Sequence, residues 1–81
     1  MTPEIRLWRA VLNRAYEDAE QRSVERTRAR KYLCGYASEE DLRLVCDFAD
    51  VSADALIHWA RKRYGNWLKE EAMGIRRHLF N

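Results

Sequence analysis

Basic side chains that can bind a polyanion are grouped in two parts of this 81-residue chain. His58, Arg61 and Lys62 have the spacing that places side chains on one face of a helix. Their imidazole, guanidinium and ammonium groups can donate hydrogen bonds to base edges and to phosphates. A second set of cations, suited to phosphate contacts, comprises Arg22, Arg26, Arg30 and Arg63. Together these residues form the DNA-binding surface that the sequence predicts.

The three arginines at positions 22, 26 and 30 repeat every four residues, which predicts a basic stripe along one side of a helix. The opposite, inner face of the same helix would carry Ala29, Tyr32, Leu33 and, as a further candidate, Tyr36. We therefore expect the stripe to face solvent, where phosphates can reach it.

Charge alternates along the chain, although its net charge is only +2. Residues 21–37 carry five bases and one acid, residues 38–54 carry six acids and one base, and residues 61–81 carry six bases and two acids. One interpretation is that neighbouring helices neutralise each other, and the other is that two basic surfaces are open to a polyanion. Asp47, Asp50 and Asp54 lie beside the predicted base-contacting helix and oppose phosphate binding there.

Four helix starts are marked by residues that cap helices. Thr2, followed by Pro3, begins a helix that should run to about residue 20. Ser23 is the candidate cap of a second helix, which Gly35 ends, although residues 17–31 contain no Gly or Pro. One long bent helix is therefore the alternative to two.

Ser38 opens a third helix in a capping-box pattern, with an acid three residues later. Apolar side chains lie around much of the circumference of this helix, so we expect it to be the most buried element. We expect it to end near Asp50. Ser52 caps a fourth helix whose apolar phase continues to Ile75 and Leu79. Gly65-Asn66 is predicted to break it in two, the alternative being one helix with a glycine that costs about 1 kcal/mol.

Residues 42–63 have the outline of a helix-turn-helix. Cys46 or Ala49 would be the small residue where the helices cross, and Leu56 and Ile57 would anchor the second helix. Asp50 stands where glycine is usual, and aspartate tolerates the left-handed backbone better than most residues. The alternative is an ordinary antiparallel helix pair with a capped turn. The predicted fold is thus one all-α domain over residues 1–81, a small bundle of four helices, or five if the break at Gly65 occurs.

This region resembles small proteins of temperate phages, prophages and gene transfer agents. Those proteins share the pattern Asp-Phe-x-x-Val-Cys-x-x-Ala-Gly-Val-Asp-Pro-x-x-Val, to which residues 41–56 correspond. An upstream Leu-Trp-x-Ala-Val is matched by residues 7–11, and an aromatic-Leu pair by Tyr32-Leu33. The chain departs from the pattern with Leu42 for Phe, Asp50 for Gly and Ser52-Ala53 for Asp-Pro. The resemblance, over about residues 5–60, implies a phage-associated regulatory or DNA-binding domain and carries over no catalytic residue.

Catalysis is not expected. His58 and His78 are the only histidines, and Cys34, Cys46 and His58 are too evenly spaced for a zinc site, so we expect no metal, cofactor or small-molecule substrate. No secretory signal or membrane span is recognised, so we expect a cytoplasmic protein with reduced, buried thiols.

Two binding hypotheses follow. The leading one is a phage-type regulator that binds DNA. The alternative is a module that binds or inhibits a host protein complex, either RNA polymerase or a defence system. Trp8, Trp59 and Trp67 exceed what a monomer core of this size usually holds, although the latter two are predicted to be core residues. A homodimer through the final helix is therefore a further expectation.

Overall fold

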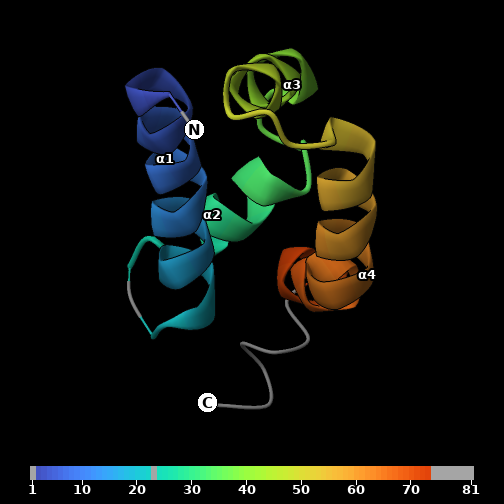
Figure 1. Cartoon of the computed structure of the whole chain (residues 1–81). Helices are drawn as coiled ribbons and strands as arrows, with labels where there is room; N and C mark the ends of the chain where they lie inside the picture. The colour runs from blue at the N-terminus through green and yellow to red at the C-terminus, as the bar shows by residue number, and fades with distance from the viewer. Residues whose placement is uncertain (1, 23, 74–81) are drawn as a thin grey trace.

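The computed structural model describes residues 2–22 and 24–73, and these form four α-helices and no strand. The helices are α1 (Pro3–Glu20), α2 (Arg26–Leu33), α3 (Glu39–Phe48) and α4 (Ala53–Ala72). The prediction of an all-α bundle is confirmed. In Figure 1, α1 and α4 stand on opposite sides, α2 lies between them, and α3 crosses one end. Within the described residues, no Cα atom of α1 comes within 8 Å of a Cα atom of α4.

Three predicted caps are confirmed by hydrogen bonds to the first helical turn. The hydroxyl oxygens of Thr2, Ser38 and Ser52 accept from the backbone N–H groups three residues later, each at 3.2 Å. These bonds satisfy N–H groups that have no partner inside the helix, so the starts of α1, α3 and α4 are determined locally.

The second helix begins later than predicted, at Arg26, after Glu25, whose side chain makes no capping bond. Ser23 lies outside the described residues. The alternative of one long bent helix is wrong, because α1 ends at Glu20. Gly35 ends α2 as predicted. Its φ of +77° is the left-handed conformation that glycine adopts without a steric penalty, and the N–H of Tyr36 reaches back to the Lys31 carbonyl.

The turn between α3 and α4 uses Asp50 in the role that glycine usually plays. Its φ is +56°, and the Val51 N–H donates to the Cys46 carbonyl at 2.9 Å. The predicted tolerance of the left-handed conformation is thus confirmed. The expectation that α3 is the most buried helix is wrong, since Leu44 is 53% and Phe48 is 49% exposed.

The predicted break at Gly65-Asn66 is wrong, because α4 runs without interruption from Ala53 to Ala72. Tyr64 and Leu68 are both buried in the same cluster, so packing on either side of Gly65 keeps the helical path. A Cβ atom at Gly65 would meet nothing within 4 Å. The predicted apolar positions Ile75 and Leu79 lie outside the described residues.

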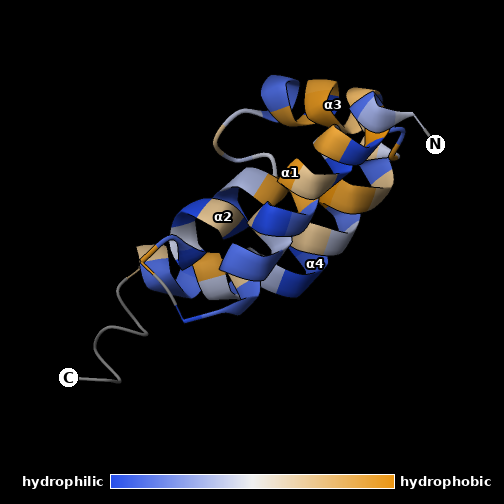
Figure 2. Cartoon of the chain, turned by 60° about the vertical axis from the view of Figure 1, so that its left-hand side comes forward, coloured by the Kyte–Doolittle hydropathy of each residue, from blue (hydrophilic) through white to orange (hydrophobic). Residues whose placement is uncertain are grey.

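The core consists of two clusters that meet. One joins α1, α2 and α4 around Leu33 and Tyr64, and the other joins α1, α3 and α4 around Leu12 and Leu42. Tyr32 packs against both clusters and connects them. Figure 2 shows hydrophobic and hydrophilic residues alternating within single turns of the helices, as expected when one face is buried. None of the described helices is long and apolar enough to cross a membrane.

Candidate functional site

Arg61, predicted to contact bases, is engaged within the protein. Its Nε donates to the Cys34 carbonyl at 2.9 Å, and its Nη2 lies 3.2 Å from Glu39 Oε1. The guanidinium also lies 5.1 Å from the ring centre of Tyr36. Arg61 therefore ties α4 to the connection between α2 and α3.

His58 and Lys62 remain exposed on the outer side of α4. In the part of the chain that the structure describes, neither forms an ion pair. Ile57, predicted to anchor the second helix, is 5% exposed and belongs to the core, because that turn of α4 packs against Leu42 and Cys46. The predicted base-contacting surface is thus reduced to two side chains.

The prediction that three arginines form a stripe along one helix is wrong. Arg22 lies after the end of α1 and before the start of α2, so only Arg26 and Arg30 share a helix. These two point towards α4 rather than to solvent. Arg30 lies 4.2 Å from the ring centre of Trp67, and Arg26 lies 5.0 Å from it.

Arg30 also donates from Nε to the Ala19 carbonyl at 2.8 Å, which satisfies an acceptor in the last turn of α1. The contact with an aromatic face and the hydrogen bond to the helix end both stabilise the Arg30 guanidinium in its partly buried position. Arg63 is engaged in a similar way, because it pairs with Glu20 of α1 and lies over the rings of Trp59 and Tyr64.

Ion pairs connect the acidic middle of the chain to its neighbours. Arg43 binds Asp54 at 2.9 Å and Glu39 at 3.3 Å, so it joins α3 to the first turn of α4. The hydrogen bonds that the Arg43 guanidinium donates to the carboxylates of Asp54 and Glu39 raise its pKa. With the Arg61–Glu39 and Arg63–Glu20 pairs, these contacts favour neutralisation between helices as the explanation of the charge pattern.

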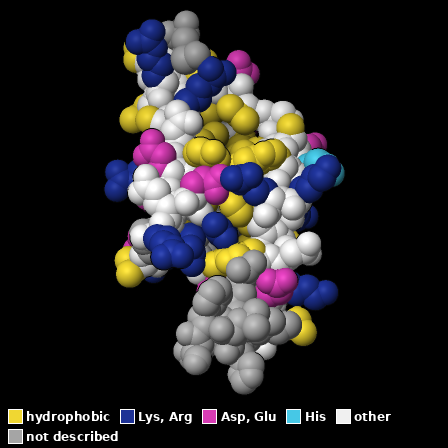
Figure 3. All heavy atoms as spheres, turned by 90° about the horizontal axis from the view of Figure 1, so that it is seen from below, with side chains coloured by type: hydrophobic (Ala, Val, Ile, Leu, Met, Phe, Trp, Pro, Cys, Tyr) yellow, Lys and Arg dark blue, Asp and Glu magenta, His cyan; other side chains and the backbone are white. Residues whose placement is uncertain are grey.

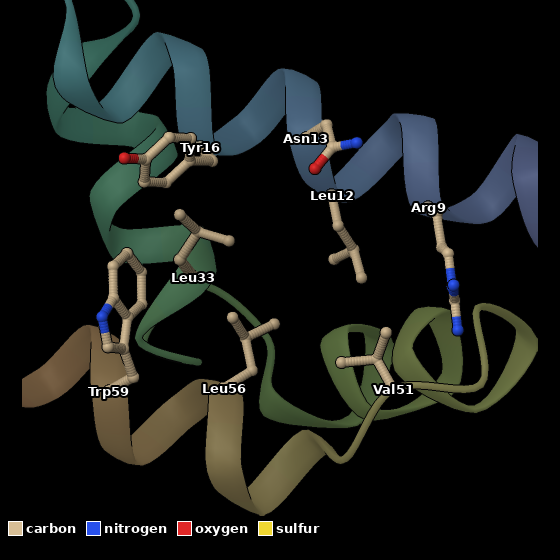
Figure 4. Close-up of a pocket in the computed structure, with 8 residues that line it drawn as sticks. All are labelled: Arg9, Leu12, Asn13, Tyr16, Leu33, Val51, Leu56 and Trp59. Carbon is tan, nitrogen blue, oxygen red and sulfur yellow. The ribbon is translucent and has the colours of Figure 1, made fainter.

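A pocket of about 470 Å³ lies between α1 and α4. It exists because these two helices do not approach each other, while Leu33 of α2 and Val51 form parts of its wall. In Figure 4, the leucine side chains of α1, α2 and α4 point into this space. The lining residues are Arg9, Leu12, Asn13, Tyr16, Leu33, Val51, Leu56 and Trp59.

Aromatic side chains border one end of the pocket, and a guanidinium borders the other (Figure 4). Tyr16 and Trp59 approach each other with ring centres 5.8 Å apart, and they are 44% and 39% exposed. At the other end, Arg9 Nε donates to the Ala49 carbonyl at 2.9 Å. The expectation that Trp59 is a core residue is therefore wrong, because its ring borders an open pocket.

The sequence did not predict this pocket. Its lining comes from four separate segments, and the excess of aromatic residues was the only signal of an unpaired apolar surface. Figure 3 shows one face of the molecule, on which hydrophobic side chains gather in the middle and both basic and acidic side chains surround them. This face therefore does not present a surface of one charge.

Both cysteines of the chain have buried side chains. Cys34 and Cys46 are both free and buried, as predicted, and burial raises the pKa of each thiol above its ordinary value. A thiol with a raised pKa is a poor nucleophile at neutral pH. Among the residues that the structure describes, no group of three His, Cys, Asp or Glu side chains is placed to hold a metal ion.

Comparison with known proteins identifies no relative: no family model, no curated protein and no solved structure matches this chain.

Proposed function

We propose that this chain is a protein-binding module whose pocket between α1 and α4 receives apolar side chains from a helix of a partner protein. The observation that carries the proposal is the apolar pocket of about 470 Å³ with half-exposed Tyr16 and Trp59 at its border. Tyrosine and tryptophan beside a pocket are the residues that most often dominate binding energy at protein interfaces.

A helix is the occupant that fits the shape and the charges best. Two helices form the long walls, and an amphipathic helix binds such a groove by inserting side chains that lie one turn apart. The border carries charges of both signs, with Arg9 at one end and the Glu20–Arg63 pair beyond the aromatic residues at the other. A partner helix with an apolar face and polar flanks of both signs matches this border.

DNA binding is the second candidate, and the turn before α4 supports it. Asp50 and the Ser52 cap give α3 and α4 a short, defined connection, while His58, Lys62 and Arg22 remain exposed. It ranks below protein binding because Arg30, Arg61 and Arg63 bind groups within the chain. The resemblance to small phage proteins makes a cytoplasmic complex of a bacterial host, such as RNA polymerase or a defence system, the partner class to test first.

The proposal is tested by capture from a bacterial lysate after nuclease digestion, with a variant that fills the pocket. Asn13 lines the pocket and is exposed, so Asn13→Arg places a long charged side chain at its mouth without removing core atoms. Asn66→Arg is the matched control, because Asn66 is exposed on α4 outside the pocket lining. We expect wild type and Asn66→Arg to retain the same partner and Asn13→Arg to lose it.

Retention of that partner by Asn13→Arg would contradict the pocket as the binding site. Loss of the partner on nuclease digestion would favour the DNA candidate instead. That candidate predicts duplex DNA binding that weakens steeply with salt and that falls in the His58→Ala/Lys62→Ala variant. No binding to duplex DNA at low salt would reject it.

A further inference from the structure

Exposed apolar side chains form a strip across α1 and α3 on the outside of the bundle. α3 crosses the end of the bundle where α1 begins (Figure 1), and Trp8 meets Phe48 there with ring centres 5.2 Å apart. Leu44, one turn before Phe48, is 53% exposed, and Leu7, next to Trp8, is 61% exposed. The apolar strip consists of Leu7, Trp8, Val11, Leu44 and Phe48.

The apolar strip belongs neither to the core nor to the pocket. Leu44 lies two residues from the fully buried Leu42 and Cys46, which places it about 160° from each around the axis of α3. Val11 lies two residues before Asn13 of the pocket lining, so these two residues are also about 160° apart on α1. The strip and the pocket therefore lie on opposite sides of α1.

Four carboxylates surround the apolar strip, and each lies about one helical turn from one of its members. Glu4 precedes Trp8 by four residues, and Asp47 follows Leu44 by three. This acidic rim comprises Glu4, Glu40, Asp41 and Asp47, all of which are exposed. None of the four forms an ion pair within the residues that the structure describes.

The arginines near the strip do not neutralise the rim. Arg43 and Arg14 pair with carboxylates outside the rim. Arg9 donates to backbone carbonyls at the end of α3. Arg6 precedes Trp8 by two residues, which places it on the far side of α1 from the Trp8 ring. The surface around the strip is therefore negative.

Helix dipoles account for only part of the rim. Glu4, Glu40 and Asp41 lie in first turns, where the dipole favours a carboxylate. Asp47 lies in the last turn of α3, where a carboxylate opposes the dipole. Its position beside an exposed leucine and an exposed phenylalanine does not serve the stability of the isolated chain, and it indicates a surface made for a partner.

We propose that the apolar strip and its acidic rim form a second docking surface, which binds a basic amphipathic helix of another protein. Apolar side chains one turn apart on that helix match the spacing of Leu44 and Phe48, and lysines or arginines beside them reach the rim. This surface is separate from the pocket and does not rest on the function proposed for it. A chain with both surfaces joins two proteins.

The charge of the rim selects this occupant over the others. A symmetric contact with a second copy of this chain would bring two acidic rims together. Duplex DNA and anionic membranes present the same sign of charge as the rim and are repelled by it. A basic helix is the partner that buries the strip and neutralises the carboxylates together.

The test is an NMR titration of the full chain with two synthetic helical peptides. The first carries leucines one turn apart on one face and lysines at the other positions, and the second carries glutamate in place of each lysine. We expect the lysine peptide to shift the indole N–H resonance of Trp8 and to leave that of Trp59, at the pocket, unchanged. We expect binding to weaken with salt and the glutamate peptide to shift neither resonance.

Two variants test the two parts of the surface. Leu44→Ser should weaken binding of the lysine peptide by about four- to fifteenfold, because about half of a leucine side chain is no longer buried by the peptide. Asp47→Lys should weaken it by about two- to thirtyfold, because it exchanges an attractive contact for a repulsive one. Glu17→Lys is the matched control, since Glu17 is an exposed acid of α1 outside the rim. It should bind the peptide as wild type does.

An unshifted Trp8 at millimolar lysine peptide would overturn the inference. A shift of Trp59 alone would also overturn it, because the peptide would then occupy the pocket. Equal binding of the two peptides, or equal binding by Asp47→Lys and Glu17→Lys, would show that charge does not select the partner. A Trp8 shift that grows with the concentration of the chain alone would make a second copy the occupant instead.

Discussion

Arg61 gives the sharpest test of whether the basic residues of α4 serve the fold or a ligand. Its side chain holds α4 against the connection between α2 and α3 through the Cys34 carbonyl, Glu39 and Tyr36. We expect Arg61→Ala to lower the free energy of unfolding. We also expect Arg61→Lys, which keeps a cation near Glu39 but lacks Nε, to lower it by a smaller amount.

The size of the effect follows from the three contacts. A partly buried hydrogen bond from a charged donor contributes about 1.5–3 kcal/mol. The exposed ion pair contributes about 0.2–1 kcal/mol, and the exposed cation–aromatic contact about 0.5–1 kcal/mol. Ordering the long side chain offsets about 1.5–2 kcal/mol of this. The net loss in Arg61→Ala is then about 2 kcal/mol, which lowers Tm by about 8–16 °C in a domain of this size.

Thermal unfolding followed by circular dichroism measures this loss, with Lys62→Ala as the control. Lys62 is the adjacent exposed cation and forms no ion pair within the described residues, so its removal should change stability by less than about 0.5 kcal/mol. Equal melting temperatures for Arg61→Ala and Lys62→Ala would refute the structural role of Arg61. A loss of DNA binding in an Arg61 variant has to be interpreted together with this measurement.

Three further predictions concern the backbone and the thiols. Gly65→Ala should raise the free energy of unfolding by about 0.5–1 kcal/mol in urea titrations, because α4 is continuous and the added Cβ meets nothing within 4 Å; a lower stability would show that the helix needs glycine there. Asp50→Gly should leave the free energy of unfolding unchanged or raise it by up to about 1 kcal/mol, since φ is +56°. A fall in that free energy would mean that the Asp50 side chain contributes a contact. Burial raises the pKa of the Cys34 thiol in the folded state above its ordinary value of 9.0. The neutral thiol therefore contributes its full stabilisation at pH values below the thiol pKa of the unfolded chain, and this stabilisation is lost as pH rises through the pKa of the folded state. Stability of wild type should therefore fall more steeply between pH 8 and pH 11 than that of Cys34→Ala, and identical slopes would contradict the burial effect.

Local features of the fold could be predicted from the sequence because they depend on short-range interactions. Thr2, Ser38 and Ser52 cap helices through bonds to residues three positions away, so a few residues contain all the information. The left-handed Asp50 is likewise a property of its own backbone and of the turn. Gly65-Asn66 shows the limit of such rules, because burial of Tyr64 and Leu68 keeps α4 intact against a local preference for a turn.

The roles of the arginines could not be predicted from the sequence, because tertiary partners decide them. Spacing places Arg26 and Arg30 on one side of a helix, but it does not reveal that Trp67 faces that side or that the Ala19 carbonyl needs a donor. The pocket is hidden for the same reason. Its walls are helices that lie more than thirty residues apart in the sequence, and its volume depends on how α2 separates them.

The most direct test of the central claim is the Kd of the purified partner for wild type, Asn13→Arg and Asn66→Arg, measured by calorimetry. The pocket predicts that Asn13→Arg weakens binding at least tenfold, which corresponds to about 1.4 kcal/mol, because the apolar side chains of the partner must then displace a charged group. Asn66→Arg, with the same change in charge on the other helix, should bind as wild type does. Equal Kd values for the two variants would show that the partner does not enter the pocket between α1 and α4.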